Sequence, residues 1–241
     1  TNRYPSRGWN AYHVVYQDAQ RWLKEGIHDA LFPMMYFQGN NFYPFALDWK
    51  ENDGKRWIIP GLGIYFLSPR EQDWPLDEIV RQIHFTRQIK LNGQAYFRNR
   101  FLLDNTKGVL DELEENFYTY PALIPPMTWS DSIPPSVPSH PSVQQIANGK
   151  LRMSWQASAD NSNQSVVYHL YGSDTYPVDI KQPQNLIATH LIANEYEYTA
   201  KLPWLQKRYF AVTAADRFGN ESAPLTLNTV SDMDIPLLNK G

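Results

Sequence analysis

Three apolar segments in the first half of the chain are each followed by residues that could hold a sugar. Tyr36 and Gln38 follow the first segment, Tyr65 lies at the end of the second, and Arg98 lies toward the end of the third. Their polar groups suit hydrogen bonds to sugar hydroxyls, and the ring of Trp49 could stack on a sugar face. Further residues of this kind at the same places are Asn40, Asn41, Phe66, Ser68, Asn99 and Arg100. The alternative for each is a structural role at the rim of the fold.

Carboxylates are the usual catalytic groups of glycosidases, which place two of them about 5 Å apart for retention or about 6.5–9.5 Å apart for inversion. Asp29 precedes its apolar segment and so belongs to the opposite end of the predicted fold. The acids that follow the apolar segments, and so lie on the same side as the residues above, are all in polar stretches, where a solvated charge is the ordinary explanation: Asp48, Glu51, Asp53, Glu71, Asp73 and Asp104. The sequence therefore identifies no catalytic pair.

Other chemistries lack their motifs. The chain has no cysteine, its histidines show no metal-binding spacing, and no serine elbow is present. No glycine-rich phosphate loop follows a strand, and the glycines of "GLGIYF" (61–66) are interpreted as close-packing positions. We expect no cofactor and no metal. The net charge of −3, without a basic run, argues against nucleic acid, and no apolar stretch has the length of about 20 residues that spans a bilayer.

Helical and strand patterns alternate through residues 14–118. Strands are predicted at 28–37, 57–66 and 93–103, and helices at 16–26, from Pro75 onward, and after Thr106, which is a candidate N-cap. Strands that are apolar on both faces and alternate with helices indicate parallel βαβ units. These units could form an open doubly wound sheet, a small complete α/β domain or a piece of a barrel.

A resemblance to a known family favours the barrel. "YQDAQRWLKEGIHDALFPMMYFQ", "IIPGLGIYF" and "YPALIPPMTWSDSIPPSVP" together resemble the C-terminal portion of a bacterial family of glycoside-hydrolase-like proteins related to family ten. The resemblance implies a TIM barrel, often followed by a fibronectin-like module, that acts on glycans outside the cytoplasm. A full barrel takes about 250 residues. We therefore expect that the chain was cut from a longer protein, that catalytic acids lie upstream, and that the incomplete barrel self-associates.

The segment after residue 142 changes to short alternating strands, the pattern of an all-β sandwich. Predicted strands are 150–156, 166–173, 185–192, 195–200 and 208–216. Trp155, Tyr168 and "YFAVTAADRFGNESAP" (209–224) resemble a fibronectin type III domain, which implies that the first two are core residues and that "DRFGNES" turns into the last strand. A sugar-binding role for Tyr176 or Trp204 is the weaker alternative to a structural one.

The predicted organisation is therefore α/β plus all-β. Residues 1–133 form the C-terminal portion of a TIM-barrel domain, 134–141 a proline-rich joint, 142–230 an immunoglobulin-like fibronectin type III sandwich, and 231–241 a tail. The apolar residues of "ALIPPMTW" (122–129) are expected to pack on the barrel portion. The predicted function is that of a fragment, inactive alone, of an extracytoplasmic glycoside hydrolase with a glycan ligand. The alternative is a non-catalytic carbohydrate-binding or scaffold protein.

Overall fold

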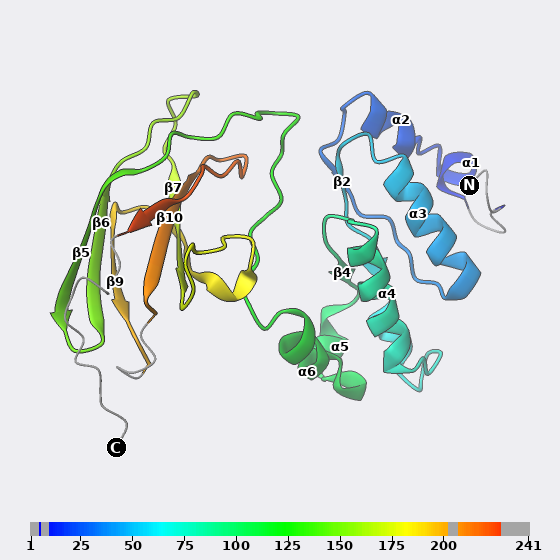
Figure 1. The fold of residues 1–241 in the computed structure, drawn as a ribbon. Helices are drawn as coiled ribbons and strands as arrows, with labels where there is room; N and C mark the ends of the chain where they lie inside the picture. The colour runs from blue at the N-terminus through cyan, green and yellow to red at the C-terminus, as the bar shows by residue number, and fades with distance from the viewer. Residues whose placement is uncertain (1–4, 6–9, 202–206, 228–241) are drawn as a thin grey trace, which may run out of the picture. The chain divides into compact units, whose positions relative to one another are not determined.

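The computed structural model describes residues 5, 10–201 and 207–227. The chain divides into two compact units, residues 1–119 and 120–241, each of which is described by itself. The first unit mixes helices with short parallel strands, and the second is made of antiparallel strands (Figure 1). The predicted tail at 231–241 and Trp204 lie outside the described residues.

The three predicted strand segments of the first unit contain four short strands, which form two parallel pairs. β1 (Ala30–Leu31) pairs with β2 (Trp57–Ile58), and β3 (Gly61–Leu62) pairs with β4 (Ala95–Tyr96). Met34 bridges to Gly61 in parallel, so the two pairs are continuous. The predicted parallel βαβ arrangement is thereby confirmed, although the regular strands are shorter than the apolar segments that contain them.

Helices precede, join and follow these strands, and the periodicity predicted those near 16–26, from Pro75 onward and after Thr106. The helices are α1 (Ala11–Val15), α2 (Ala19–Lys24), α3 (Tyr43–Glu51), α4 (Leu76–Gln88), α5 (Asn99–Leu103) and α6 (Val109–Glu112), the last continuing as a π-helix to Phe117. α4 has Ile79 and Ile83 buried against the core, and Pro75 is its N-cap residue. The prediction of a strand over 99–103 was wrong, because α5 follows β4 directly.

Two further local predictions were wrong. α3 was assigned to a loop, yet nine residues from Tyr43 onward are helical. Thr106 does not cap the last helix: Gly108 is the N-cap residue of α6, and the Asn105 side chain bonds the helix start, its Oδ1 accepting from the backbone N–H groups of Leu110 (2.9 Å) and Asp111 (3.4 Å). Pro44 explains part of the first error, since proline near a helix start is favourable but reads as a helix breaker in sequence.

The second unit is a two-layered sandwich. One sheet has the order β5 (Ser139–Ala147), β6 (Lys150–Gln156), β9 (Glu195–Thr199). The other has the order β11 (Leu225–Leu227), β10 (Tyr209–Ala215), β7 (Val167–Ser173), β8 (Leu186–Leu191). Five strands fall where the alternation placed them. β5 was missed because it begins inside the proline-rich stretch that was predicted to be a joint.

The core of the sandwich draws on both sheets, and Trp155 and Tyr168 lie in it with ring centroids 5.4 Å apart. The turn before β11 is also as expected. Asp216 Oδ1 accepts from the backbone N–H groups of Phe218 (2.8 Å) and Asn220 (2.9 Å), and Gly219 takes a left-handed φ of +81°.

The segment "ALIPPMTW" packs on the sandwich, not on the first unit as predicted. Leu123 contacts the cluster formed by Tyr171, Val178, Leu186 and Ala211. The N–H of Met127 donates to the carbonyl of Phe218 (2.8 Å), and the Asn220 side chain donates to the Asp131 carbonyl (3.0 Å). The division of the chain between the two units therefore falls after residue 119, whereas the sequence suggested a boundary at 133.

Candidate functional site

The carboxyl ends of the three parallel strands bring together aromatic side chains from separate parts of the chain. The rings of Tyr36 and Phe97 are stacked, with centroids 5.2 Å apart and planes inclined by 17°. Tyr65 meets each of them edge-on, with centroids 5.7 Å from both. We call Tyr36, Tyr65 and Phe97 the aromatic triad. Offset stacks and edge-on contacts are the arrangements that aromatic quadrupoles favour.

The backbone fixes the positions of these rings. The N–H of Phe97 donates to the carbonyl of Leu62 (2.9 Å), and the N–H of Tyr65 donates to the carbonyl of Phe97 (3.1 Å). Two of the triad residues are therefore linked through the sheet hydrogen bonds themselves. The parallel register places the third beside them, because Tyr36 follows the bridge between Met34 and Gly61.

Two glycines make room for Tyr36. A Cβ at Gly61 would lie 3.0 Å from Tyr36 Cε1, and a Cβ at Gly63 would lie 3.1 Å from Tyr36 Cβ. Such contacts are tighter than ordinary van der Waals distances, so the ring can approach this strand only because both positions lack a side chain. The interpretation of these glycines as close-packing positions is confirmed.

Arg98 lies next to the triad. It follows Phe97, its side chain is exposed, and its guanidinium carbon is 5.4 Å from the ring centroid of Phe101. Burial raises the pKa of Tyr65, the negative charge of Glu71 adds to the rise, and the positive charge of Arg98 opposes it. Burial also raises the pKa of Tyr36. Both tyrosines are therefore neutral hydroxyl donors near pH 7.

The other predicted residues are placed differently. Gln38 is exposed on the loop after Tyr36, close in sequence to the triad. Trp49 lies on α3 and packs against two hydrophobic clusters, so it is a core residue and not part of this group. Phe97 was missed by the sequence reasoning, although its position two residues after Ala95, at the end of the third strand, was a usable signal.

Most of the acids predicted on this side make structural contacts. Asp53 pairs with Lys50 (2.9 Å), and Asp104 pairs with Arg100 (3.3 Å). Asp73 receives Lys107 Nζ at 2.6 Å, and Asp48 accepts from Gln20 at 3.3 Å. Glu51 also has a partner. Only Glu71 acts on the triad, through its effect on the pKa of Tyr65.

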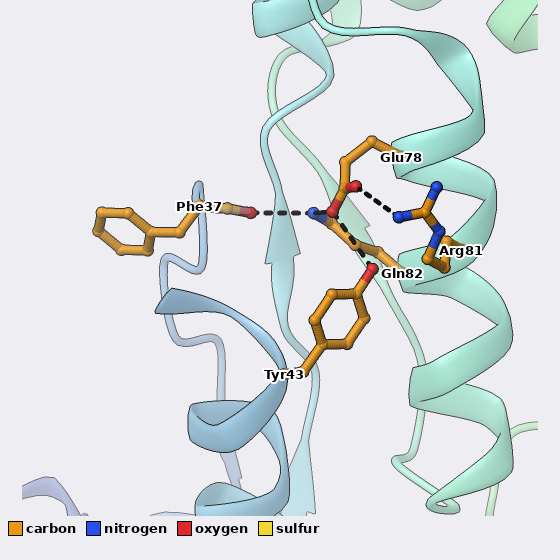
Figure 2. A network of polar contacts seen from close by, with 5 residues as sticks. All are labelled: Phe37, Tyr43, Glu78, Arg81 and Gln82. Carbon is orange, nitrogen blue, oxygen red and sulfur yellow. Dashed lines mark hydrogen bonds and ion pairs between the residues drawn. The ribbon is translucent and has the colours of Figure 1, made fainter. Parts of the chain in front are cut away.

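A buried carboxylate that the sequence reasoning missed lies on α4. Glu78 is 6% exposed and Gln82, one turn later, is fully buried. Figure 2 shows how they connect to Phe37: Gln82 Nε2 donates to the carbonyl of Phe37 (2.9 Å) and to Glu78 Oε1 (3.0 Å). Tyr43 Oη donates to the same Glu78 oxygen (3.2 Å), and Arg81 pairs with the other one (3.4 Å). Burial and Glu78 raise the pKa of Tyr43 to about 12.

Across the described part of the chain, His and acidic side chains form no cluster of three that could hold a metal ion. No helix within the described ranges is both long enough and apolar enough to cross a membrane.

Comparison with known proteins gives one curated relative. The chain is 29% identical over 226 residues to "Glycosyl hydrolase YngK" of Bacillus subtilis (strain 168), an alignment that covers 89% of this chain and 44% of that protein. The chain thus spans less than half the length of this relative. No family model matches the sequence.

Solved structures similar to part of the chain include a domain named fibronectin type III, the FN5 domain of Drosophila Lar and domains of titin. The fibronectin type III domain of human fibronectin type III domain containing protein 3 matches with 19% identity and a TM-score of 0.29, covering 43% of this chain and 95% of that one. The FN5 domain of Drosophila Lar matches with 15% identity and a TM-score of 0.25, covering 39% and 96%. Domains A168–A170 of titin match with 14% identity and a TM-score of 0.29, covering 39% and 30%. The chain is therefore similar over most of its length to a protein named a glycosyl hydrolase, and over part of it to fibronectin-like structures.

Proposed function

We propose that the first unit is the C-terminal portion of a TIM barrel of a glycoside-hydrolase-like protein related to family ten, and that the second unit is a fibronectin type III-like domain. The protein would act on glycans outside the cytoplasm, a location that the family resemblance alone supports. The observation that carries the proposal is the meeting of Tyr36, Tyr65, Phe97 and Arg98 at the carboxyl ends of parallel strands, which is where barrel enzymes bind their substrates.

The two faces of the strands support the barrel. Along the first strand, Leu31 and Met35 pack against core clusters, whereas Phe32 and Met34 are exposed. Phe97 on the third strand is also 45% exposed. An apolar strand face opposite the core is the face that closes inward when further strands complete a barrel. Uncovered, it is a site for association, so we expect this 241-residue chain to self-associate.

The triad suits a sugar ring. Phe97 offers an exposed apolar surface, Tyr36 and Tyr65 offer hydroxyl groups, and Arg98 offers several donors on an exposed side chain. Hydrolysis would need two acids facing the same bond. Since the nearby acids other than Glu71 make contacts elsewhere, we expect the chain to bind glycans without cleaving them. This observation also favours the second candidate, a non-catalytic carbohydrate-binding protein.

Glycan binding and cleavage can be measured on the same protein. Isothermal titration against soluble oligomers of glucose, xylose and N-acetylglucosamine should reveal a ligand, and a reducing-end assay should show no cleavage. Phe97→Ala and Arg98→Ala should each weaken binding about tenfold, the loss of roughly one good stacking or charged contact. Arg70→Ala, at another exposed arginine of the first unit, serves as the control. Binding that is unchanged in both site variants would refute the assignment of the site, and cleavage by this chain would refute its predicted inactivity.

A further inference from the structure

The loop that follows Tyr36 is tied to α4 at both of its ends. This 37–43 loop, as we call residues 37–43, contains Gln38 and a short 3-10 helix over Gly39–Asn41. Its first residue, Phe37, offers its carbonyl to Gln82, and its last, Tyr43, offers its hydroxyl to Glu78 (Figure 2). The two α4 residues are four apart, so they lie one above the other on the same helix face.

The hydrogen-bond partners of Gln82 determine which way its side-chain amide points. Both neighbours of the Gln82 amide nitrogen, the Phe37 carbonyl and the Glu78 carboxylate, are acceptors, so turning the amide over would place oxygen against oxygen. Gln82 Oε1 meanwhile has no partner within the described chain. A buried amide oxygen without a partner costs free energy. A purely apolar residue at position 82 would avoid this cost, but it would lack the two N–H groups that bond Phe37 and Glu78.

The loop itself has few bonds of its own. Inside it, the N–H of Asn41 donates to the Gln38 carbonyl (3.1 Å) and the N–H of Phe42 donates to the Gly39 carbonyl (2.9 Å). Gln38, Asn40 and Asn41 are all exposed. Phe42 is fully buried in the core, so it anchors the C-terminal side of the loop. The segment before it, with short-range bonds and exposed side chains, loses conformational entropy when it binds a ligand unless another element holds it in place.

We propose that Glu78 and Gln82 are positioning residues, which hold the 37–43 loop preformed and thereby set the affinity of the triad region for glycan without touching the glycan. The inference rests on the proposed function for its effect on binding, but the holding of the loop can be tested without any ligand. The negative charge of Glu78 strengthens the hydrogen bonds it accepts, and Arg81, 64% exposed at its side chain, balances that charge from outside the loop.

Hydrogen exchange followed by mass spectrometry tests the holding of the loop. Gln82→Leu removes the bond to the loop at a fully buried position, and Gln88→Leu makes the same change at an exposed position of the same helix. Tyr43→Phe removes only the hydroxyl at the other end. We expect exchange in the 37–43 loop to speed up about two- to tenfold in Gln82→Leu and in Tyr43→Phe, the effect of one lost buried hydrogen bond. Gln88→Leu should leave it unchanged.

Two results would overturn the proposal. One is loop exchange in Gln82→Leu and Tyr43→Phe that matches Gln88→Leu. The other is a rise in exchange that is uniform over the first unit, which would make these residues general stabilisers. Tyr43→Phe keeps the test valid if Gln82→Leu fails to fold, because it removes one atom from a partly exposed ring.

The effect on binding has its own readout, which a purely structural role would not change. If Gln82 acts through the loop, Gln38→Ala should weaken glycan binding in the natural protein and have less effect in Gln82→Leu, where the loop is already displaced. Additive losses would contradict the coupling. Absence of glycan binding in the natural protein would refute the proposed function, while the exchange result would still decide whether the loop is held.

Discussion

Replacing Gly63 by alanine tests whether the aromatic triad depends on a strand without side chains. The added Cβ would lie 3.1 Å from Tyr36 Cβ, 3.2 Å from Phe66 Cδ2 and 3.4 Å from Tyr36 Cα. Tyr36 would therefore meet it near the backbone, where a side-chain rotation gives no relief. Gly63 has φ −83° and ψ 65°, a conformation open to alanine, so steric crowding is the only cost.

The magnitude follows from two opposing effects. Overpacking costs about 1–3 kcal/mol, and the lower entropy of the unfolded chain offsets about 0.4–1 kcal/mol of that. The midpoints of these two ranges differ by about 1.3 kcal/mol, so we expect Gly63→Ala to destabilise the first unit by about 1 kcal/mol. Gly93→Ala is the matched control, because its Cβ would meet only Ile59 at 3.8 and 3.9 Å. The control should be neutral or slightly stabilising.

Hydrogen exchange is the suitable assay, since the chain has two units and a single unfolding midpoint would mix them. The amides to follow are those of Phe97 and Tyr65, which are bonded through the sheet beside the triad. Near-ultraviolet circular dichroism should also change in Gly63→Ala as the rings shift. Equal protection in Gly63→Ala and the natural protein, or equal loss in Gly93→Ala, would refute the packing argument.

Three further predictions concern single contacts. His169 is 4% exposed and burial lowers its pKa below 6.5, so the folded state favours the neutral ring. The stability that the neutral ring contributes at pH 7.5 should decrease as the pH falls below 6.5. Urea unfolding, followed through the exchange protection of the sandwich amides, should show this decline, and His169→Gln should flatten it. Asn220→Ala should cost the sandwich about 1–3 kcal/mol in the same assay, because a buried amide that bonds to two oxygens is removed. Lys107→Met should destabilise the first unit by about 1 kcal/mol by exchange, since its ammonium joins Asp73 to the Trp74 carbonyl; Arg100→Met, which breaks an exposed pair, should cost less than about 0.5 kcal/mol.

The alternation of apolar and polar residues, together with the turn residues, predicted most of the sandwich from the sequence. Leu151, Met153 and Trp155 alternate with polar residues, and all three are buried in β6. The same reasoning worked less well in the first unit. Apolar residues ran through the predicted strands on both faces, so the pattern located the segments without showing where each strand ends.

Contacts between distant segments explain what the sequence reasoning missed. Trp49 was given a sugar-stacking role because α3 was not recognised, and only the tertiary fold shows that it faces two core clusters. Glu78 sits in the first turn of a helix, where an acid is ordinary, and its burial depends on Tyr43, 35 positions away. Neither relation has a local signal.

The contacts of Leu123, Met127 and Asp131 decide where the chain should be cut if the sandwich is to be expressed alone. The proline-rich stretch is part of the sandwich, because it is hydrogen-bonded to the turn that contains Phe218 and Asn220. A sandwich expressed from residue 134 would lack this stretch. The cluster around Tyr171 would become more exposed, and the Asn220 amide would lose the Asp131 carbonyl as an acceptor. A sandwich expressed from residue 120 would keep Leu123 on this cluster. The chain should therefore be divided before the prolines.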